Sequence, residues 1–264
     1  MAITAKDVKN LRDKTGAGML DCKKALTAAD GNIEEALENL RKSGIAKAEK
    51  KASRATKDGN FFIKVEGNKG VIVEGLCETD FVATNAQFLG FGDNVTTKAL
   101  ASDANGDISD AVQADNKDEL TALIAKIGEN MQLRRGIKWE SEGQIDSYIH
   151  GKRIAVLIDV EGEADAELLH NICMHIAAFN PQYITPDEIP AEDIAKEKEI
   201  AKAQLTGKPE NIIEKILEGK INKWYSECCL TRQPWIIDDK TNLSKLAPKA
   251  VIKRFARWEI GEEL

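Results

Sequence analysis

A strand followed by a polar turn and a helix is indicated twice along this chain, and this repetition constrains the fold more than any other feature. Residues 71–74 (Val-Ile-Val-Glu) precede Asp80 as residues 156–159 (Val-Leu-Ile-Asp) precede Asp165, at a constant shift. Hydrophobic patterns of strand period and of helix period alternate around both segments, which is typical of an α+β fold. The sequence therefore predicts a duplicated core of two related α+β subdomains with antiparallel sheets.

The first subdomain is expected over residues 59–140 and begins with a β-hairpin. Phe61, Ile63 and Val65 lie at alternate positions, as in a half-buried strand. Residues 66–70 (Glu-Gly-Asn-Lys-Gly) are typical of a turn, and the apolar run after them continues as the second strand.

Two helices are expected after this hairpin. Asp80 can cap the first helix. Its apolar face would be formed by Phe88, Phe91 and Val95. Residues 102–115 are acidic and contain glycine, so we expect them to connect the two helices. The second helix is indicated by apolar residues at helical spacing: Leu120, Leu123, Ile124, Ile127 and Met131. We expect it to end at residues 134–136 (Arg-Arg-Gly), where basic side chains suit the helix dipole.

The second subdomain is expected over residues 141–264. A turn at residues 150–152 (His-Gly-Lys) leads into a strand of the buried type over residues 154–160, and a helix follows. The apolar face of that helix would be formed by Leu169, Ile172 and Ile176. A last strand over residues 251–260 is expected to join the same sheet.

A protruding helical hairpin is expected as an insertion in the second subdomain, over residues 191–226. A charged helix over residues 191–205, a turn at residues 207–210 (Gly-Lys-Pro-Glu) and a returning helix rich in isoleucine form this pattern. We expect the two helices to pack as a coiled coil.

The start of the chain reads as three short helices. Thr4 and Asn32 can cap the first and the third, each with an acidic residue three positions later. Segments with glycine at residues 15–18 and 30–31 separate the helices, and residues 43–44 (Ser-Gly) should end the last one. We predict a compact three-helix module.

A basic segment links this module, residues 1–44, to the core. Between residues 41 and 57 the chain carries seven basic side chains and a single acid, Glu49. An exposed linking helix explains this composition, and an arm that binds nucleic acid is the alternative. We favour the linking helix and assign residues 45–58 to a basic linker, because the whole chain has a formal charge of −7.

The composition excludes several classes of protein. An acidic chain is a poor general ligand for phosphate backbones, so we expect no nucleic-acid partner. No stretch approaches the roughly 20 apolar residues that span a bilayer, and the first residues resemble neither a signal peptide nor a presequence. We therefore expect a cytoplasmic protein without membrane contact.

Metal and catalytic motifs are absent from the sequence. The five cysteines include no CxxC pair and the three histidines no HExxH motif, which favours reduced structural thiols, no metal and no cofactor. Phosphate-binding glycine loops and nucleophile elbows are also missing. An enzyme is therefore the weaker interpretation, although a hydrolase with carboxylates assembled in space and a binding scaffold remain alternatives.

Two segments resemble the signature segments of the elongation factor Ts family. They are residues 11–26 (Leu-Arg-Asp-Lys-Thr-Gly-Ala-Gly-Met-Leu-Asp-Cys-Lys-Lys-Ala-Leu) and residues 77–83 (Cys-Glu-Thr-Asp-Phe-Val-Ala). Shorter similarities follow in the family's order at residues 126–130, 148–151, 174–178 and 230–234. The resemblance spans nearly the whole chain.

The resemblance implies both a fold and a function. It implies a ubiquitin-associated-like helical module, a core of two subdomains and a projecting coiled-coil hairpin. It also implies a guanine-nucleotide exchange factor without catalytic residues, which binds elongation factor Tu in its GDP-bound and nucleotide-free forms and binds no nucleotide itself. In the family the helical module holds the partner's nucleotide-binding domain, and the second subdomain holds another domain.

The resemblance also assigns candidate site residues. The family's Thr-Asp-Phe-Val segment, which reaches the partner's magnesium site, corresponds to Thr79, Asp80, Phe81 and Val82. Phe81 would be the inserted side chain and Asp80 the polar residue beside it. Without the family, Asp80 would be a helix cap and Phe81 a core residue.

Five further residues are candidate contacts with the partner: Arg12, Met19, Lys23, Ile127 and His150. Alternative roles remain open for three of them. Met19 can instead fill the core of the helical module, Ile127 belongs to an apolar helical face, and His150 lies in an expected turn.

Overall fold

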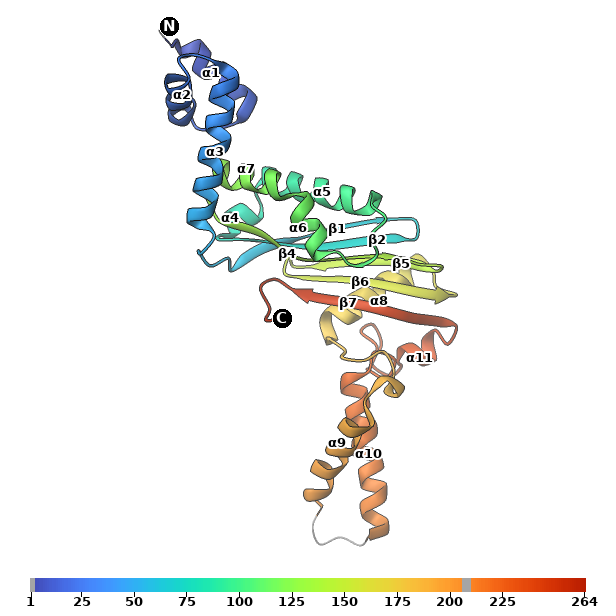
Figure 1. Ribbon diagram of the computed structural model, residues 1–264. Helices are drawn as coiled ribbons and strands as arrows, with labels where there is room; N and C mark the ends of the chain where they lie inside the picture. The colour runs from blue at the N-terminus through green and yellow to red at the C-terminus, as the bar shows by residue number, and fades with distance from the viewer. Residues whose placement is uncertain (1–2, 206–209) are drawn as a thin grey trace. The chain divides into compact units, whose positions relative to one another are not determined.

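The computed structural model describes residues 3–205 and 210–264 (Figure 1). The fold is mixed α+β, with helices at the N-terminus and two antiparallel sheets, as the sequence predicts. Contacts divide the chain into two compact units. Unit 1 comprises Met1–Lys64, Val71–Trp139 and Glu259–Leu264, and unit 2 comprises Val65–Gly70 and Glu140–Trp258.

Unit 1 begins with the three predicted helices, α1 (Ala5–Thr15), α2 (Met19–Ala28) and α3 (Ile33–Lys51). The predicted caps of α1 and α3 are confirmed. Thr4 and Asp7 form a capping box, and the Asn32 side chain accepts hydrogen bonds from two backbone N–H groups of α3. A small apolar core holds the helices together: Val8, Leu11, Cys22, Ala25, Leu26, Ala29 and Ala36.

The predicted end of the third helix at residues 43–44 is wrong, because α3 continues to Lys51. Gly44 is buried inside the helix, where a Cβ atom would lie 3.4 Å from the Ala125 side chain of α7 (Lys117–Ile127). The glycine therefore permits close packing of α3 on α7, and this packing outweighs its low helix propensity.

Acids from other segments pair with the basic residues of the linking segment. Arg41 bonds Asp118, Lys47 bonds Asp21 and Arg54 bonds Glu78, at 2.6, 2.7 and 3.3 Å. Lys42 pairs within α3 with Glu38. These pairs favour the interpretation of the segment as a linking helix over a nucleic-acid-binding arm.

The first sheet has the strand order β1-β2-β4-β3. Its strands are β1 (Asp58–Glu66), β2 (Lys69–Cys77), β3 (Gly106–Asp107) and β4 (Met131–Glu140). The predicted hairpin is therefore confirmed. The remaining helices of unit 1 are α4 (Asp80–Ala83), α5 (Ala86–Ala101), α6 (Ser109–Asp115) and α7.

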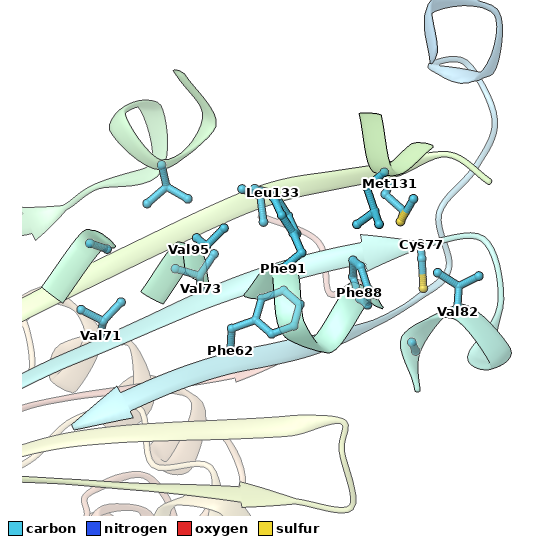
Figure 2. Packing of buried hydrophobic residues seen from close by; sticks show 14 of the residues in the cluster. Phe62, Val71, Val73, Cys77, Val82, Phe88, Phe91, Val95, Met131 and Leu133 are labelled. Atoms are coloured by element: carbon cyan, nitrogen blue, oxygen red, sulfur yellow. The ribbon is translucent and has the colours of Figure 1, made fainter. Parts of the chain in front are cut away.

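A continuous apolar core lies between this sheet and its helices (Figure 2). The predicted face of α5 is confirmed, because Phe88, Phe91 and Val95 are buried. The rings of Phe62 and Phe88 meet edge to face at 5.2 Å. A Cβ atom on Gly92 would lie 1.9 Å from the Phe62 ring, so only glycine fits there.

Three sequence predictions in this region are wrong. Residues 102–115 contain β3 and α6 as well as connecting turns. The helix cap is Thr79 and not Asp80, which is the first residue of α4. The last predicted helix ends at Ile127, and residues 131–140 form β4. Gly128 has a φ of +94° and caps α7, so the apparent helical spacing of Met131 reflects burial in a strand.

Unit 2 contains the second sheet, with the strand order β5-β6-β7. Its strands are β5 (Gln144–His150), β6 (Ile154–Gly162) and β7 (Ala250–Glu259), which confirms the predicted turn, buried strand and last strand. Helix α8 (Ala166–Phe179) packs on β5 and β6, and its predicted apolar face, Leu169, Ile172 and Ile176, is buried. Two short helices, η1 (Pro186–Glu188) and α11 (Leu243–Leu246), occupy the connecting segments.

Helices α9 (Ala191–Ala203) and α10 (Glu210–Cys228) are in contact and form the predicted helical pair. An apolar cluster that includes Cys228, Cys229 and Ile189 lies at its base. The predicted turn at 207–210 lies outside the described residues except for Glu210.

Each sheet buries a carboxylate on its second strand. In unit 1, Glu74 accepts hydrogen bonds from Arg134 Nε at 2.8 Å, Arg135 Nε at 2.7 Å and the backbone N–H of Gly261 at 3.0 Å. In unit 2, Asp159 of β6 accepts a hydrogen bond from Arg254 Nε of β7 at 2.9 Å. Because these charges are paired, their burial is tolerated.

Replacing Glu74 with alanine is expected to lower the free energy of unfolding by about 3 to 5 kcal/mol, because it removes the acceptor shared by two largely buried arginines. Urea denaturation followed by circular dichroism measures this loss. Glu163→Ala removes an exposed pair with Lys249 and should cost at most about 1 kcal/mol. Equal losses for the two variants would contradict this account of the cluster.

Candidate functional site

The 79–82 segment follows directly after strand β2, which ends at Cys77. Thr79 has an extended backbone, and its hydroxyl oxygen accepts a hydrogen bond from Val82 N at 3.4 Å. This cap starts the four-residue helix α4. A helix this short is not stable by itself, so its position depends on contacts with the rest of unit 1.

Two side chains of α4 are buried in the core of unit 1, and two are exposed to solvent. Val82 is only 6% exposed and packs in the core of unit 1 (Figure 2), and Ala83 is buried beside it. Phe81 is 82% exposed, and Asp80 is exposed as well. The alternative interpretation of Phe81 as a core residue is therefore wrong. The fold instead anchors α4 through Val82 and presents a large aromatic side chain to solvent.

Two carboxylates hold the base of this segment. Glu129 accepts hydrogen bonds from the backbone N–H of Thr79 at 3.1 Å and from its hydroxyl at 2.8 Å. Glu78 accepts a bond from the backbone N–H of Asn130 at 2.6 Å and one from Arg54 at 3.3 Å. Residues 78–79 are thus fixed to residues 129–130, which lie between α7 and β4.

Glu78, Glu129 and Asn130 lie in segments that resemble the family, but they were not predicted as site residues. The available signal was Gly128, which is typical of a helix end and would have placed Glu129 and Asn130 in a turn. Nothing in the sequence pairs that turn with residues 78–79, because about 50 residues separate the partners.

Two groups at the base of the segment, Glu78 and Cys77, have pKa values shifted by their surroundings. The hydrogen bond from Asn130 N, with smaller contributions from Arg54 and Lys51, lowers the pKa of Glu78 below its ordinary value. Burial, together with the nearby Glu129 charge, raises the pKa of Cys77 to about 12. The Cys77 thiol is therefore protonated at neutral pH and is not an activated nucleophile.

The candidate contacts in the helical module all lie on its surface. Arg12 and Lys23 are exposed, and Met19 is 48% exposed. Met19 therefore does not fill the core of the module. Leu20, which was not among the predicted contacts, is even more exposed than Met19, so the start of α2 presents two adjacent apolar side chains.

The remaining two candidates belong to different units. Ile127, in unit 1, is half-buried and packs against the apolar core. His150, in unit 2, is exposed at the end of β5, and its Nδ1 atom lies 3.0 Å from the Tyr148 hydroxyl. The structure thus brings residues 79–82 together in one segment and places the other five elsewhere.

Within residues 3–205 and 210–264, no group of three or more His, Cys, Asp or Glu side chains could hold a metal ion. All five cysteines are buried and free. None of the helices described is long and apolar enough to cross a membrane. A cavity of about 220 Å³ lies between α2, α3 and α7, and small and apolar residues such as Leu40, Gly44 and Ala125 form much of its wall.

These features are those of a site that binds another protein. The site is an exposed aromatic side chain on a short helix that is fixed at its base, next to the buried, protonated Cys77 thiol. An exposed aromatic side chain of this kind is typical of a contact with a partner protein.

Comparison with known proteins identifies the family. A family model described as elongation factor TS matches residues 78–262. The chain is 44% identical to elongation factor Ts of Vibrio vulnificus strain YJ016, in an alignment that covers 99% of this chain and 93% of the relative. It is 46% identical to elongation factor Ts of Erwinia tasmaniensis and 45% identical to that of Escherichia coli O139:H28, with 98% of this chain and 92% of each relative covered. The chain belongs to the elongation factor Ts family.

Membership of this family confirms the main functional predictions. The protein is a translation elongation factor and the nucleotide exchange factor for elongation factor Tu. It is not an enzyme, and like other translation factors it acts in the cytoplasm.

Glu129→Ala is expected to loosen α4 while the rest of the fold remains intact. The variant loses two hydrogen bonds to a carboxylate, and each such bond contributes about 1.5 to 3 kcal/mol to stability. Amide hydrogen exchange of residues 80–84 should therefore become faster by roughly tenfold or more. Hydrogen exchange with mass spectrometry measures this change. Glu38→Ala, which removes only an exposed pair within α3, should leave these amides unchanged. Identical protection in both variants would exclude Glu129 as the support of α4.

Glu78 is expected to make the stability of unit 1 depend on pH in the acidic range. Its folded-state pKa is lowered, so the unfolded chain binds more protons, and stability rises with pH across this window. The stabilisation is complete above the ordinary value of 4.5 and is lost as pH falls through the folded-state pKa. Urea denaturation at a series of acidic pH values should show a shallower pH dependence for Glu78→Gln than for the wild-type protein. Unchanged profiles would rule this out.

Proposed function

We propose that the 79–82 segment is the part of this protein that opens the nucleotide site of elongation factor Tu. In this proposal Phe81 inserts beside the partner's magnesium site, and Asp80 is the polar residue next to it. The insertion disturbs the elements that hold the magnesium ion and the phosphates, and GDP is released. The observation that carries the proposal is the 82% exposure of Phe81 on a helix fixed through Val82 and Glu129.

The other candidate residues are proposed to hold the partner while Phe81 acts. Arg12, Met19 and Lys23 would contact the partner's nucleotide-binding domain from a ubiquitin-associated-like module over residues 1–44. The exposed apolar start of α2 supports this role, because adjacent exposed apolar side chains commonly mark interaction sites. Ile127 and His150 would add contacts, His150 from the second subdomain.

We further propose the domain division that the sequence indicates. A basic linker over residues 45–58 joins the module to a duplicated core of subdomains 59–140 and 141–264, with the coiled-coil hairpin inserted at 191–226. The equivalent strand orders β1-β2-β4 and β5-β6-β7 support a duplication. The buried carboxylates Glu74 and Asp159, each bound by arginine from the neighbouring strand, support it further.

Exchange of this kind needs no catalytic side chain. A protein that binds the nucleotide-free partner more tightly than the nucleotide-bound one must weaken nucleotide binding by the same factor. Burying one phenylalanine contributes about 1.5 to 3 kcal/mol, and each tenfold change needs about 1.4 kcal/mol. Burial of Phe81 can therefore weaken nucleotide binding by the partner about 10- to 100-fold, and any further weakening must come from the other contacts.

Phe81→Ala is expected to slow GDP release from elongation factor Tu by roughly 10- to 100-fold, because it removes that burial energy. Stopped-flow release of a fluorescent GDP analogue at a saturating concentration of the variant measures the rate. Asp80→Ala should have a smaller effect.

Leu246→Ala is a matched control, since it also removes an exposed apolar side chain but lies in unit 2. Its release rate should equal that of the wild-type protein. If the Phe81→Ala variant folded normally and elongation factor Tu still released GDP at the rate seen with the wild-type protein, the assignment of Phe81 would be rejected.

A further inference from the structure

The turn between α7 and β4 contacts two segments that are distant in sequence. Gly128 ends α7 in the left-handed conformation, and its N–H donates to Ile124 O at 2.9 Å. The chain then passes through Glu129 and Asn130 into β4. These two residues are therefore held between a packed helix and a central strand of the sheet, which makes them a rigid support.

Asn130 joins the turn to the chain that follows α3. Its side chain is almost fully buried, and Nδ2 donates to Arg54 O at 2.8 Å and to Ala52 O at 3.4 Å. Both acceptors lie just beyond Lys51, the last residue of α3. One amide group thus fixes the end of the helix that carries the N-terminal module.

The same residue also contacts the base of the 79–82 segment. The backbone N–H of Asn130 donates to Glu78 at 2.6 Å, and the adjacent Glu129 binds Thr79 through both carboxylate oxygens. Arg54 closes the network by donating to the same oxygen of Glu78 at 3.3 Å. The end of α3 and the base of α4 are therefore tied to one turn.

We propose that Asn130 is a positioning residue for nucleotide exchange, which holds the Phe81 helix in a fixed relation to the end of α3. This inference rests on the proposed function of the 79–82 segment. Asn130 does not contact the partner. It allows the helical module and Phe81 to bind as one rigid body, so that the binding energy of the module drives the insertion of Phe81 and is not consumed in ordering α4.

If Asn130 only stabilised the fold, its replacement would affect exchange no more than replacement of another buried asparagine. Asn116 is the matched control for this comparison. Asn116 is also a buried asparagine of unit 1, and its Nδ2 donates to Val112 O at 2.8 Å while its Oδ1 accepts from Lys98 at 3.0 Å. Its bonds join α6 to α5 and do not involve residues 52–54 or 78–79. Alanine at either position removes a buried amide, but only Asn130→Ala removes the bonds that join the end of α3 to the turn supporting α4. The more exposed Arg54–Glu78 pair is then the remaining bond between these segments.

The test is a double-mutant cycle between Asn130→Ala and Phe81→Ala. The maximal rate of GDP release from elongation factor Tu is measured by stopped flow at saturating protein, so that weaker binding does not affect the result. Asn130→Ala should slow release by about fivefold or more in the wild-type background and by less than about twofold in the Phe81→Ala background, since coupled residues are not additive. Asn116→Ala should leave the maximal rate unchanged in both backgrounds.

The role of Asn130 and the role of Phe81 are tested by different measurements. Slowing by Asn130→Ala that is equal in the two backgrounds, or no slowing at all, overturns the inference. Phe81→Ala by itself tests the proposed function. Circular dichroism and thermal unfolding verify that each variant is folded. If Asn130→Ala does not fold, Asn130→Ser is used, because its hydroxyl leaves a polar group at the buried position. Like alanine it keeps the backbone donor to Glu78 and loses the amide donor to residues 52 and 54, so the same expectations hold.

Discussion

The support of a short helix by the interior of unit 1 determines how this protein can act. Helix α4 has four residues and would not form alone. Burial of Val82, the Thr79 cap and the Glu129 carboxylate hold it in place, and the same geometry directs Phe81 into solvent. Contact of the phenylalanine side chain with water is unfavourable in free energy, and this contact is removed when a partner covers the side chain. Phe81 is therefore an exposed aromatic side chain on a helix whose base is fixed to the interior of unit 1.

This arrangement agrees with a protein that changes the affinity of another protein for its nucleotide. Such a protein must bind one state of its partner better than the other, and the difference in free energy comes from many contacts. A rigid mounting matters because any ordering of α4 during binding would reduce that difference. The buried, paired charge of Glu74 and the pairing of the basic segment with acids serve the same end, since they brace unit 1 internally.

Local signals predicted the elements that local interactions determine. The caps at Thr4 and Asn32, the first hairpin and the buried faces of α5 and α8 follow from spacing and turn chemistry, and all are present. Predictions failed where tertiary contacts outweigh propensity. Gly44 remains helical because α7 packs on it.

Met131 continues an apolar spacing of period 3.6 and yet belongs to a strand. The site was predicted in part. A family resemblance identified residues 79–82, but spacing alone assigned Phe81 to the core, because exposure depends on which face of α4 the sheet covers. The contacts of Glu129 and Asn130 were not predicted, because their partners are distant in sequence.

Photocrosslinking from position 81 would show whether Phe81 enters elongation factor Tu near its nucleotide site. A photoreactive phenylalanine analogue is placed at position 81, the complex with nucleotide-free elongation factor Tu is irradiated, and the crosslinked peptide is identified by mass spectrometry. If Phe81 inserts as proposed, the crosslink will be to the partner's nucleotide-binding domain, beside the magnesium and phosphate site. A complex that forms normally but crosslinks only within this chain, or to a different domain of the partner, would contradict it.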